Sequence, residues 1–260
     1  MTQAENITDL SNRTAVVIGG TSGLGRAISV ALARSGANVV PTGRRDDLVA
    51  EVCSEIETFG RKTLRDTVDV SCRESIDALR DTVLEKFGTL DILVNSAGRT
   101  ARKPTAEVSE NEWAEIFDTN LTGMLRACQS FYEPLKLSGR GRIINVASLA
   151  SFVAFHEVAA YGASKAGVLA LTRSLGSEWA RDGINVNALV PGVFPTKLNG
   201  ELLNGTERGR EILTRTPMRR FGSAEELTGA AVFLASDAAS FITGQTIAVD
   251  GGYLASGVNS

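Results

Sequence analysis

Short apolar runs alternate with longer amphipathic stretches along most of the chain. The runs are rich in valine and isoleucine, which is typical of strands that are buried on both faces of a parallel sheet. The stretches between them have helical periodicity, and this alternation indicates strand–helix–strand units. We therefore predict an α/β fold with seven parallel strands and helices on both faces. The predicted strands are Thr14–Ile18, Asn38–Thr42, Thr63–Val68, Asp91–Val94, Arg142–Val146, Asn185–Leu189 and Thr246–Val249.

Local signals mark several helix ends. Three Ser-x-x-Glu patterns begin at Ser71, Ser109 and Ser223, and each predicts a capping box at the start of a helix. Gly36 and Gly88 follow periodic stretches, where a left-handed glycine commonly ends a helix. The connections between elements are therefore expected to be short.

One segment departs from this alternation of strands and helices joined by short connections. Residues 191–217 hold three of the six prolines and several glycines. Loops of this length are usually functional or disordered, and this one follows a strand end, where open α/β sheets bind ligands. We interpret the segment as a flap over a ligand site. Since no repeat or linker interrupts the chain, residues 1–260 are predicted to form a single domain.

Composition excludes several classes of protein. The chain is 43% hydrophobic and 22% charged, and it has a net charge of -3 and no basic run that could neutralise a series of phosphates. It also lacks an apolar segment of membrane-spanning length and an apolar signal segment near Met1. Cys53, Cys72 and Cys128 have no metal-ligand spacing and fit reduced thiols. We expect a cytoplasmic protein with no metal, nucleic-acid or membrane partner.

A glycine-rich turn, Gly19–Gly25, follows the first predicted strand and opens a helix. Its backbone can approach a pyrophosphate closely at the positive end of that helix, so a dinucleotide fits there. The spacing is Gly-x-x-x-Gly-x-Gly rather than Gly-x-Gly-x-x-Gly. Taken alone, the segment is also compatible with a tight turn that binds no ligand.

The end of the second predicted strand reads Pro41-Thr42-Gly43-Arg44-Arg45. A carboxylate at this place accepts hydrogen bonds from the ribose of NAD, whereas an arginine pairs with the 2'-phosphate of NADP. Because no acid stands there, we predict NADP(H) with Arg44 on the phosphate, although NAD is possible. The alternative is that Arg44 and Arg45 are solvated charges.

Tyr161 and Lys165 are four residues apart and lie thirteen or more residues after Ser148. Residues four apart project from the same side of a helix. The ammonium can therefore lie beside the phenol and lower its pKa from the ordinary value of about 10. A tyrosine of this kind can exchange a proton with an alcohol or a ketone. An isolated Tyr-x-x-x-Lys pair is more often structural, but Ser148 and the glycine turn favour chemistry.

In combination these motifs resemble the short-chain dehydrogenase/reductase family, from about Arg13 to Gly252. The resemblance implies a Rossmann-like, doubly wound fold with one dinucleotide-binding and catalytic domain. Two departures are Ile18, where the family usually has threonine, and Ser96, where a second asparagine is common. The motifs in family order are the glycine turn, Asn95-Ser96-Ala97-Gly98, Asn120, Ser148, Tyr161-x-x-x-Lys165, Asn187 with Pro191-Gly192, and Asp250-Gly251-Gly252.

The resemblance also implies roles for individual residues. Tyr161 is expected to protonate the developing alkoxide, and Ser148 to orient and polarise the carbonyl. Lys165 is expected to bond the nicotinamide ribose and lower the pKa of the phenol, while Asn120 holds a water that links Lys165 to solvent. The implied cofactor contacts are Gly19, Thr21, Ser22, Gly23, Leu24, Gly25, Arg44, Asp69, Val70, Asn95, Ala97, Gly98, Tyr161, Lys165, Pro191, Gly192, Val193 and Thr196.

Substrate contacts are expected from Ser148, His156 and Phe194, and Phe152 and Phe155 are further candidates for the walls of the pocket. His156 is the only histidine, so a metal site is not expected, and packing is the alternative role for this side chain. Several cations suggest an anionic substrate but are equally compatible with solvated loop charges. They are Arg99, Arg102, Lys103, Lys197 and Arg208.

Within the family, the segment Thr216–Gly222 and the tail Val249–Gly252 resemble gluconate 5-dehydrogenases and related sugar-acid reductases. We therefore predict an NADP-dependent oxidoreductase that acts on a small polar ketone such as a ketogluconate. Bacterial 3-oxoacyl-carrier-protein reductases are the alternative, and a catalytically idle dinucleotide-binding module is an alternative of another class. The family also implies a homotetramer formed through the helices of residues 110–132 and 159–181.

Overall fold

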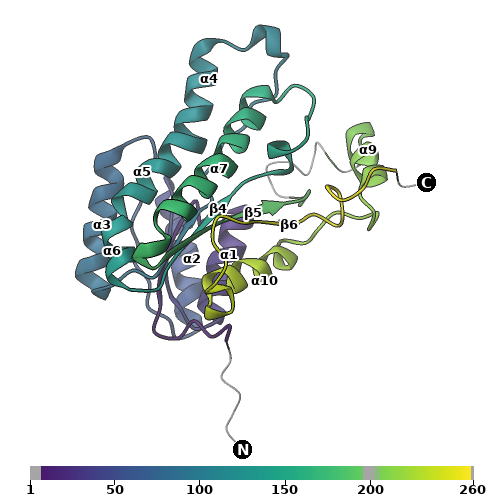
Figure 1. The fold of residues 1–260 in the computed structure, drawn as a ribbon. Coiled ribbons are helices and arrows are strands. Elements are labelled where there is room, and N and C mark those ends of the chain that lie inside the picture. Colours follow the sequence, from purple (N-terminus) through teal and green to yellow (C-terminus); the bar gives the residue numbers. More distant parts are fainter. Residues whose placement is uncertain (1–6, 196–202, 204, 259–260) are drawn as a thin grey trace, which may run out of the picture.

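The computed structural model describes residues 7–195, 203 and 205–258. A parallel sheet forms its centre, with helices on both sides (Figure 1). The strands are β1 (Thr14–Ile18), β2 (Asn38–Thr42), β3 (Ile92–Asn95), β4 (Gly141–Val146), β5 (Ile184–Pro191) and β6 (Thr246–Val249). The α-helices are α1 (Gly23–Arg34), α2 (Asp46–Thr58), α3 (Arg73–Phe87), α4 (Glu110–Phe117), α5 (Gly123–Ser130), α6 (Tyr132–Leu137), α7 (Ala159–Glu178), α9 (Glu207–Arg215) and α10 (Ala224–Ala235). A π-helical turn, η2 (Asp118–Thr122), joins α4 to α5, and short 3-10 turns are η1 (Thr105–Glu107), η3 (Leu149–Ser151), η4 (Ala180–Asp182) and η5 (Asp237–Ala239).

The sheet has the strand order β2-β1-β3-β4-β5-β6, and all neighbouring strands are parallel. The chain adds β2 on one side of β1 and then returns to add β3 on the other. Loops at the carboxyl ends of β1 and β3 therefore part in opposite directions, which opens a crevice where such sheets bind ligands. The predicted doubly wound α/β fold is confirmed.

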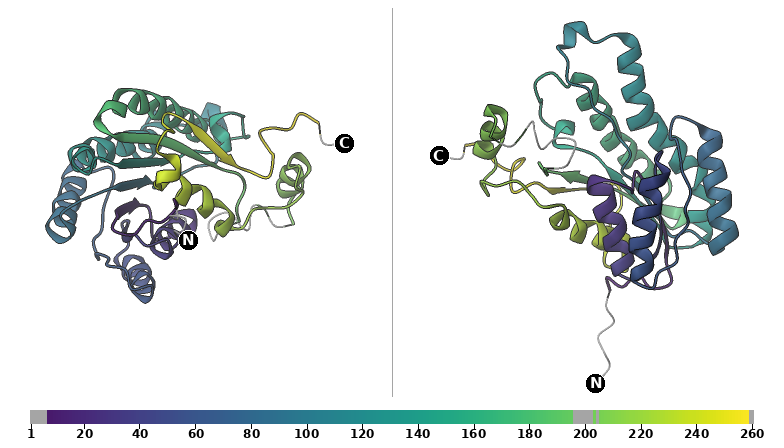
Figure 2. Two further views of the ribbon diagram at one scale, coloured as in Figure 1. Left: turned by 60° about the horizontal axis from the view of Figure 1, so that its bottom comes forward. Right: turned by 180° about the vertical axis from the view of Figure 1, so that it is seen from behind.

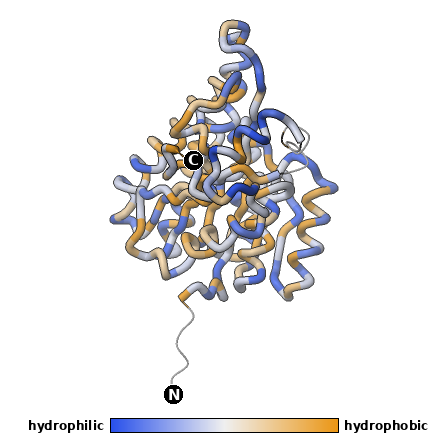
Figure 3. The backbone as a smooth tube through the Cα atoms, turned by 90° about the vertical axis from the view of Figure 1, so that its right-hand side faces the viewer, coloured by the Kyte–Doolittle hydropathy of each residue, from blue (hydrophilic) through white to orange (hydrophobic). Residues whose placement is uncertain are grey.

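Alternating strand residues contribute to two separate hydrophobic cores, one on each face of the sheet. In β1, Val16 and Ile18 belong to the core beneath α3, α5 and α7, whereas Ala15 and Val17 belong to the core beneath α1 and α10. Figure 2 shows these two helix layers on opposite sides of the sheet. Hydrophobic segments accordingly gather in the interior, with hydrophilic ones toward the periphery (Figure 3). Burial on both faces explains why the strands read as continuous apolar runs.

The described residues form six strands rather than seven, because the segment predicted as Thr63–Val68 is not a strand. It follows the outer edge of β2 and makes only two backbone bonds there, from Val39 N to Lys62 O and from Val68 N to Gly43 O. Between these two points the outward-facing residue of β2 is Pro41, which has no amide hydrogen to donate. The ladder is interrupted there, so the apolar pattern alone over-predicted the sheet.

Two of the three predicted capping boxes are confirmed, at Ser109 and Ser223. The prediction at Ser71 was wrong. The Ser71 hydroxyl and amide both donate to Asp69 Oδ1, at 2.6 and 2.9 Å, so the serine completes a turn before the helix and α3 starts with Cys72 as its N-cap. This competition between a local side-chain turn and a cap is common for short polar residues. Gly36 and Gly88 are left-handed after α1 and α3, as predicted.

The predicted flap is not entirely a loop. Strand β5 continues to Pro191, and the described part of the segment includes helix α9. Thr206 caps this helix by accepting a hydrogen bond from Gly209 N at 3.0 Å, and Ile212 is its buried apolar contact. Thr196 and Lys197, which sequence analysis assigned to the cofactor and to the group of cations, lie outside the described residues.

Candidate functional site

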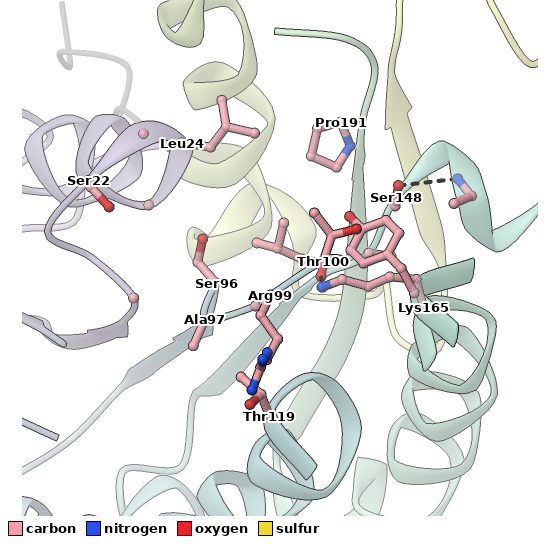
Figure 4. Close-up of a pocket in the computed structure, with 18 of the residues that line it drawn as sticks. Ser22, Leu24, Ser96, Ala97, Arg99, Thr100, Thr119, Ser148, Lys165 and Pro191 are labelled. Atoms are coloured by element: carbon pink, nitrogen blue, oxygen red, sulfur yellow. Dashed lines mark hydrogen bonds between the residues drawn. The ribbon is translucent and has the colours of Figure 1, made fainter. Parts of the chain in front are cut away.

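A cavity of about 1070 Å³ lies at the carboxyl edge of the sheet. Its walls come from the turn after β1, the loops after β2, β3 and β4, parts of α4, η2 and α7, and, within the flap, its start and helix α9. Figure 4 shows Ser22 and Leu24 of the α1 side across the cavity from Ser148 and Lys165. A single space therefore joins the glycine turn to the expected catalytic residues.

The glycines of the turn allow its backbone to pack too closely for any side chain. Gly19 has φ +78°, and a Cβ there would lie 2.5 Å from Ala97 N, while a Cβ on Gly25 would collide with Gly19 O. Helix α1 begins at Gly23, and the side chain of its N-cap, Ser22, makes no capping bond. The first amides of the helix are therefore available to an anion. This backbone cradle fits the pyrophosphate of a dinucleotide.

Arg44 and Arg45 line the same end of the cavity. Arg45 donates to Ser22 Oγ at 3.3 Å, which places one guanidinium beside the glycine turn. Hydrogen bonds from Ser71 lower the pKa of Asp69, and the nearby charge of Arg44 lowers it further. Asp46 starts α2, as sequence analysis expected, and does not line the cavity. The surroundings suit a phosphate on the adenosine ribose.

Ser148, Tyr161 and Lys165 come together in the cavity, as predicted from their spacing. Ser148 follows β4 and accepts a hydrogen bond from Ala150 N at 3.1 Å. Tyr161 and Lys165 lie one turn apart on α7, and the Lys165 ammonium is 5.9 Å from the centre of the tyrosine ring. Lys165 Nζ also donates to Val146 O at 2.7 Å, which fixes the buried amine beneath the cavity floor.

The electrostatics of Tyr161 differ from the expectation. Burial raises the pKa of its hydroxyl, and a hydrogen bond with Ser148 partly offsets this effect, whereas the charge of Lys165 is not among the causes. Burial also lowers the pKa of Lys165 to about 8. Because a phenol with a raised pKa stays protonated near neutral pH, Tyr161 suits the role of proton donor.

Asn120 is fully buried in the π-helical turn η2 and does not line the cavity. Its Oδ1 accepts from Arg99 N at 2.8 Å, and its Nδ2 donates to Arg99 O and to Ser164 Oγ. A Cβ on Gly98 would lie 3.4 Å from Asn120 Oδ1 and 3.6 Å from Lys165 Nζ, so the asparagine and the lysine flank the same backbone. The expected role in holding a water stays a prediction.

Other predicted residues lie away from the cavity. Asn95 is buried and donates to Asn145 Oδ1 at 2.9 Å, so it ties β3 to β4. The side chain of His156 is 82% exposed and that of Phe152 is also exposed, and neither lines the cavity. All other predicted contacts within the described residues line it. They are Gly19, Thr21, Ser22, Gly23, Leu24, Gly25, Arg44, Asp69, Val70, Ala97, Gly98, Ser148, Phe155, Tyr161, Lys165, Pro191, Gly192, Val193 and Phe194.

The cavity also contains residues that sequence analysis did not assign. Some of them, such as Thr100 and Leu149, directly follow strand ends, and that position was a usable signal. Others come from helix faces that the fold turns toward the cavity, where no local motif marks them. The unassigned residues of this kind include Glu115, Asp118, Thr119, Leu203 and Ile212.

Membrane-spanning helices and metal-binding clusters are both absent from the described residues. Within residues 7–195, 203 and 205–258, no helix combines the length and the apolar character needed to cross a bilayer. The same residues hold no cluster of three or more histidine, cysteine, aspartate or glutamate side chains able to bind a metal ion.

Comparison with known proteins agrees with this geometry. A family model described as enoyl-(acyl carrier protein) reductase matches residues 19–254. The 2-dehydro-3-deoxy-D-gluconate 5-dehydrogenase of Escherichia coli strain K12 is 38% identical over 247 residues, which cover 95% of this chain and 97% of that protein.

Two solved structures are also similar along nearly their whole length. One is a candidate NAD(P)-dependent gluconate 5-dehydrogenase from Beutenbergia cavernae with NADP bound at low occupancy, at 43% identity and a TM-score of 0.91, covering 96% of this chain and 100% of that one. The other is a gluconate 5-dehydrogenase from Burkholderia cenocepacia J2315 in complex with NADP and tartrate, at 34% identity and a TM-score of 0.92, covering 97% and 99%. The chain therefore belongs to the short-chain dehydrogenase/reductase family.

Proposed function

We propose that this protein is an NADP(H)-dependent oxidoreductase that interconverts a keto sugar acid and the corresponding hydroxy acid. One observation carries the proposal: a single cavity joins the glycine turn and Arg44 at one end to Ser148, Tyr161 and Lys165 at the other. Two related structures contain NADP, and one of them also contains tartrate, a small hydroxy diacid. Both support the choice of cofactor and of a small anionic substrate.

Residues of the chain would hold NADP(H) along the cavity. The turn from Gly19 to Gly25 would take the pyrophosphate, and Arg44 the 2'-phosphate. Bound NADPH supplies a hydride to the carbonyl carbon.

The side chains of the site would then donate the proton to the substrate and replace it on Tyr161. Ser148 and Tyr161 both line the cavity, and their hydroxyls would polarise a substrate carbonyl oxygen by donating hydrogen bonds to it. As negative charge grows on that oxygen, Tyr161 transfers its proton to it. Lys165, whose pKa is lowered to about 8, is protonated at neutral pH but close enough to its pKa to pass a proton onward and restore the tyrosine.

The cavity lining also carries positive charge outside the glycine turn. Arg99, Arg102 and Arg208 all contribute to its walls. A carboxylate at some distance from the reacting carbonyl matches this lining through charge-assisted hydrogen bonds. Lys103, by contrast, pairs with Glu112 and lies outside the cavity.

The test is a substrate panel followed by NADPH absorbance. We expect the purified protein to oxidise NADPH with 5-keto-D-gluconate faster than with a 3-oxoacyl thioester or an uncharged ketone. A preference for the thioester would replace the proposed substrate with that of an acyl reductase. No turnover with any ketone would favour the catalytically idle module instead.

The proposal includes a cytoplasmic homotetramer, as the family resemblance implies. On α4, Trp113 stacks on Phe117 with ring centres 4.7 Å apart, and 41% of the tryptophan is exposed, so this helix offers an apolar surface to another copy. A monomeric mass in solution scattering would contradict the tetramer.

A further inference from the structure

Besides Arg44 and Arg45, three arginines line the cavity, and they differ in their partners. Arg99 pairs with Glu115 at 2.8 Å, and Arg102 pairs with Glu157 at 2.6 Å. Each of these cations is already neutralised by a carboxylate of the protein. A substrate carboxylate would have to compete with that carboxylate for either of them.

Arg102 is held especially firmly. Glu157 has φ +65°, an uncommon conformation for a residue with a side chain, and its carbonyl accepts from Lys103 N at 2.8 Å. The backbone bond and the ion pair together fasten the loop after β3 to the loop after β4. Removing Arg102 from Glu157 would leave a partly buried carboxylate without its partner, which carries a penalty.

Arg208 has no such partner. Among the residues that the structure describes, it forms no ion pair or side-chain hydrogen bond, although it is half-buried in the cavity wall. Glu207 and Glu211, the other acids of α9, are exposed. Arg208 does affect one nearby group. Burial raises the pKa of Tyr253, and the positive charges of Arg215 and Arg208 partly offset this rise.

Helix α9 holds Arg208 at the cavity. Arg208 and Ile212 are one turn apart and both line the wall, so this helix face looks into the cavity. One turn further, the guanidinium of Arg215 lies 5.3 Å above the centre of the Tyr253 ring, and Tyr253 in turn stacks on Phe155 with ring centres 6.0 Å apart. Through these contacts Tyr253, near the carboxyl terminus, connects α9 to Phe155 in the cavity wall.

The placement of Arg208 is unfavourable for the protein alone. It lies in the first turn of α9, where a cation meets the positive end of the helix. A half-buried charge without a counter-ion in such a place is relieved by an anion that enters the cavity.

We propose that Arg208 is the specificity-determining residue that binds the substrate carboxylate, whereas Arg99 and Arg102 shape the cavity while paired with protein acids. The inference rests on the proposed function and names the residue through which that function would select acids over neutral sugars.

The test compares binding of D-gluconate and of D-glucitol, its uncharged counterpart, to the enzyme loaded with NADPH, where no hydride can be transferred to the alcohol. Isothermal titration calorimetry gives the dissociation constants for the natural protein and for Arg208→Gln. Arg210→Gln is the matched control, since Arg210 is an exposed residue of the same helix that does not line the cavity. Arg208→Lys keeps the charge but not the two-pronged geometry.

We expect Arg208→Gln to weaken gluconate binding by about 10- to 100-fold, as the loss of a charge-assisted hydrogen bond implies. Glucitol binding should change by less than about twofold, Arg210→Gln should bind both ligands normally, and Arg208→Lys should fall between the two. Equal loss for gluconate and glucitol, or equal effects of the two glutamine variants, would overturn the inference. So would a natural protein that does not prefer gluconate.

Failure of the proposed function looks different. In that case the natural protein would bind gluconate through Arg208 but would not oxidise NADPH with 5-keto-D-gluconate. The binding experiment therefore decides the role of Arg208, and the turnover experiment decides the reaction.

Discussion

The two ends of the cavity are built in different ways. At the cofactor end, the determining feature is backbone: glycines at positions 19 and 25 let the turn pack so tightly, against Ala97 and against itself, that no Cβ fits there. At the substrate end, the determining features are side chains brought from three distant segments: Arg102 with its partner Glu157, and Arg208 from α9. The first kind of site is local in the sequence, whereas the second exists only after folding. The variants below test whether this division holds.

The largest effect is expected at Tyr161, at the end of the cavity away from the glycine turn. Tyr161→Phe removes the hydroxyl but keeps the ring beside Lys165, so the turnover number should fall by about 1000-fold because general acid catalysis is lost. NADPH affinity, measured by fluorescence titration, should stay within about twofold. A variant that keeps most of its turnover would show that another group donates the proton.

A substitution confined to the cofactor end should weaken the binding of NADPH without altering the substrate end. Gly25→Ala places a methyl group against Gly19 O, so the turn must move, and NADPH should bind about 10- to 100-fold more weakly. Gly229→Ala in α10 is the control, because a Cβ there meets nothing within 4 Å. That variant should bind NADPH normally and be slightly more stable, as alanine is favoured in helices. Equal NADPH affinity in both variants would contradict the backbone cradle.

The buried Lys165 gives a prediction about stability and pH. Its pKa is about 8 in the folded protein and about 10.4 in an unfolded chain, so between these values the unfolded chain holds more protons. Stability should therefore rise with pH across this interval. Relative to Lys165→Met, which cannot titrate, the natural protein should gain up to about 3 kcal/mol of unfolding free energy.

Urea unfolding at pH 8 and pH 10 measures this gain, and the comparison with the methionine variant removes contributions from other groups. A constant difference between the two proteins over that range would mean that water reaches the amine and that its pKa is ordinary.

The smallest effect is expected at Arg44, the exposed residue proposed to bind the 2'-phosphate of NADP. Arg44→Gln should lower kcat/KM for NADPH by about 10-fold and leave the value for NADH nearly unchanged, because only NADPH carries the 2'-phosphate. Arg45→Gln, next to it on the same wall, should have the smaller effect. The opposite order would transfer the phosphate contact to Arg45, which already donates to Ser22.

Much of this protein was predictable from its sequence, because short stretches of the chain specify its strands, its glycine turn and its helix faces. All six strands of the described residues overlap predicted runs, and the glycine turn follows β1. Ser148, Tyr161 and Lys165 line one cavity, as their spacing predicted. In each case a few neighbouring residues specify a backbone conformation or share one helix face. The Thr63–Val68 prediction failed because a proline in a neighbouring segment interrupts the pairing, which no property of the run itself reveals.

Tertiary structure decided the rest. Whether a cation binds a substrate or a protein acid depends on which loops meet, and sequence analysis could not separate Arg102, which pairs with Glu157, from Arg208, which does not. The direction of the Tyr161 pKa shift was likewise set by burial under the assembled cavity walls, not by the neighbouring lysine. The sequence alone predicted Ser148, Tyr161 and Lys165, the residues proposed for catalysis, and the backbone turn, because their geometry is largely local. The tertiary structure determined charge pairing and burial, because both depend on residues that are distant along the chain.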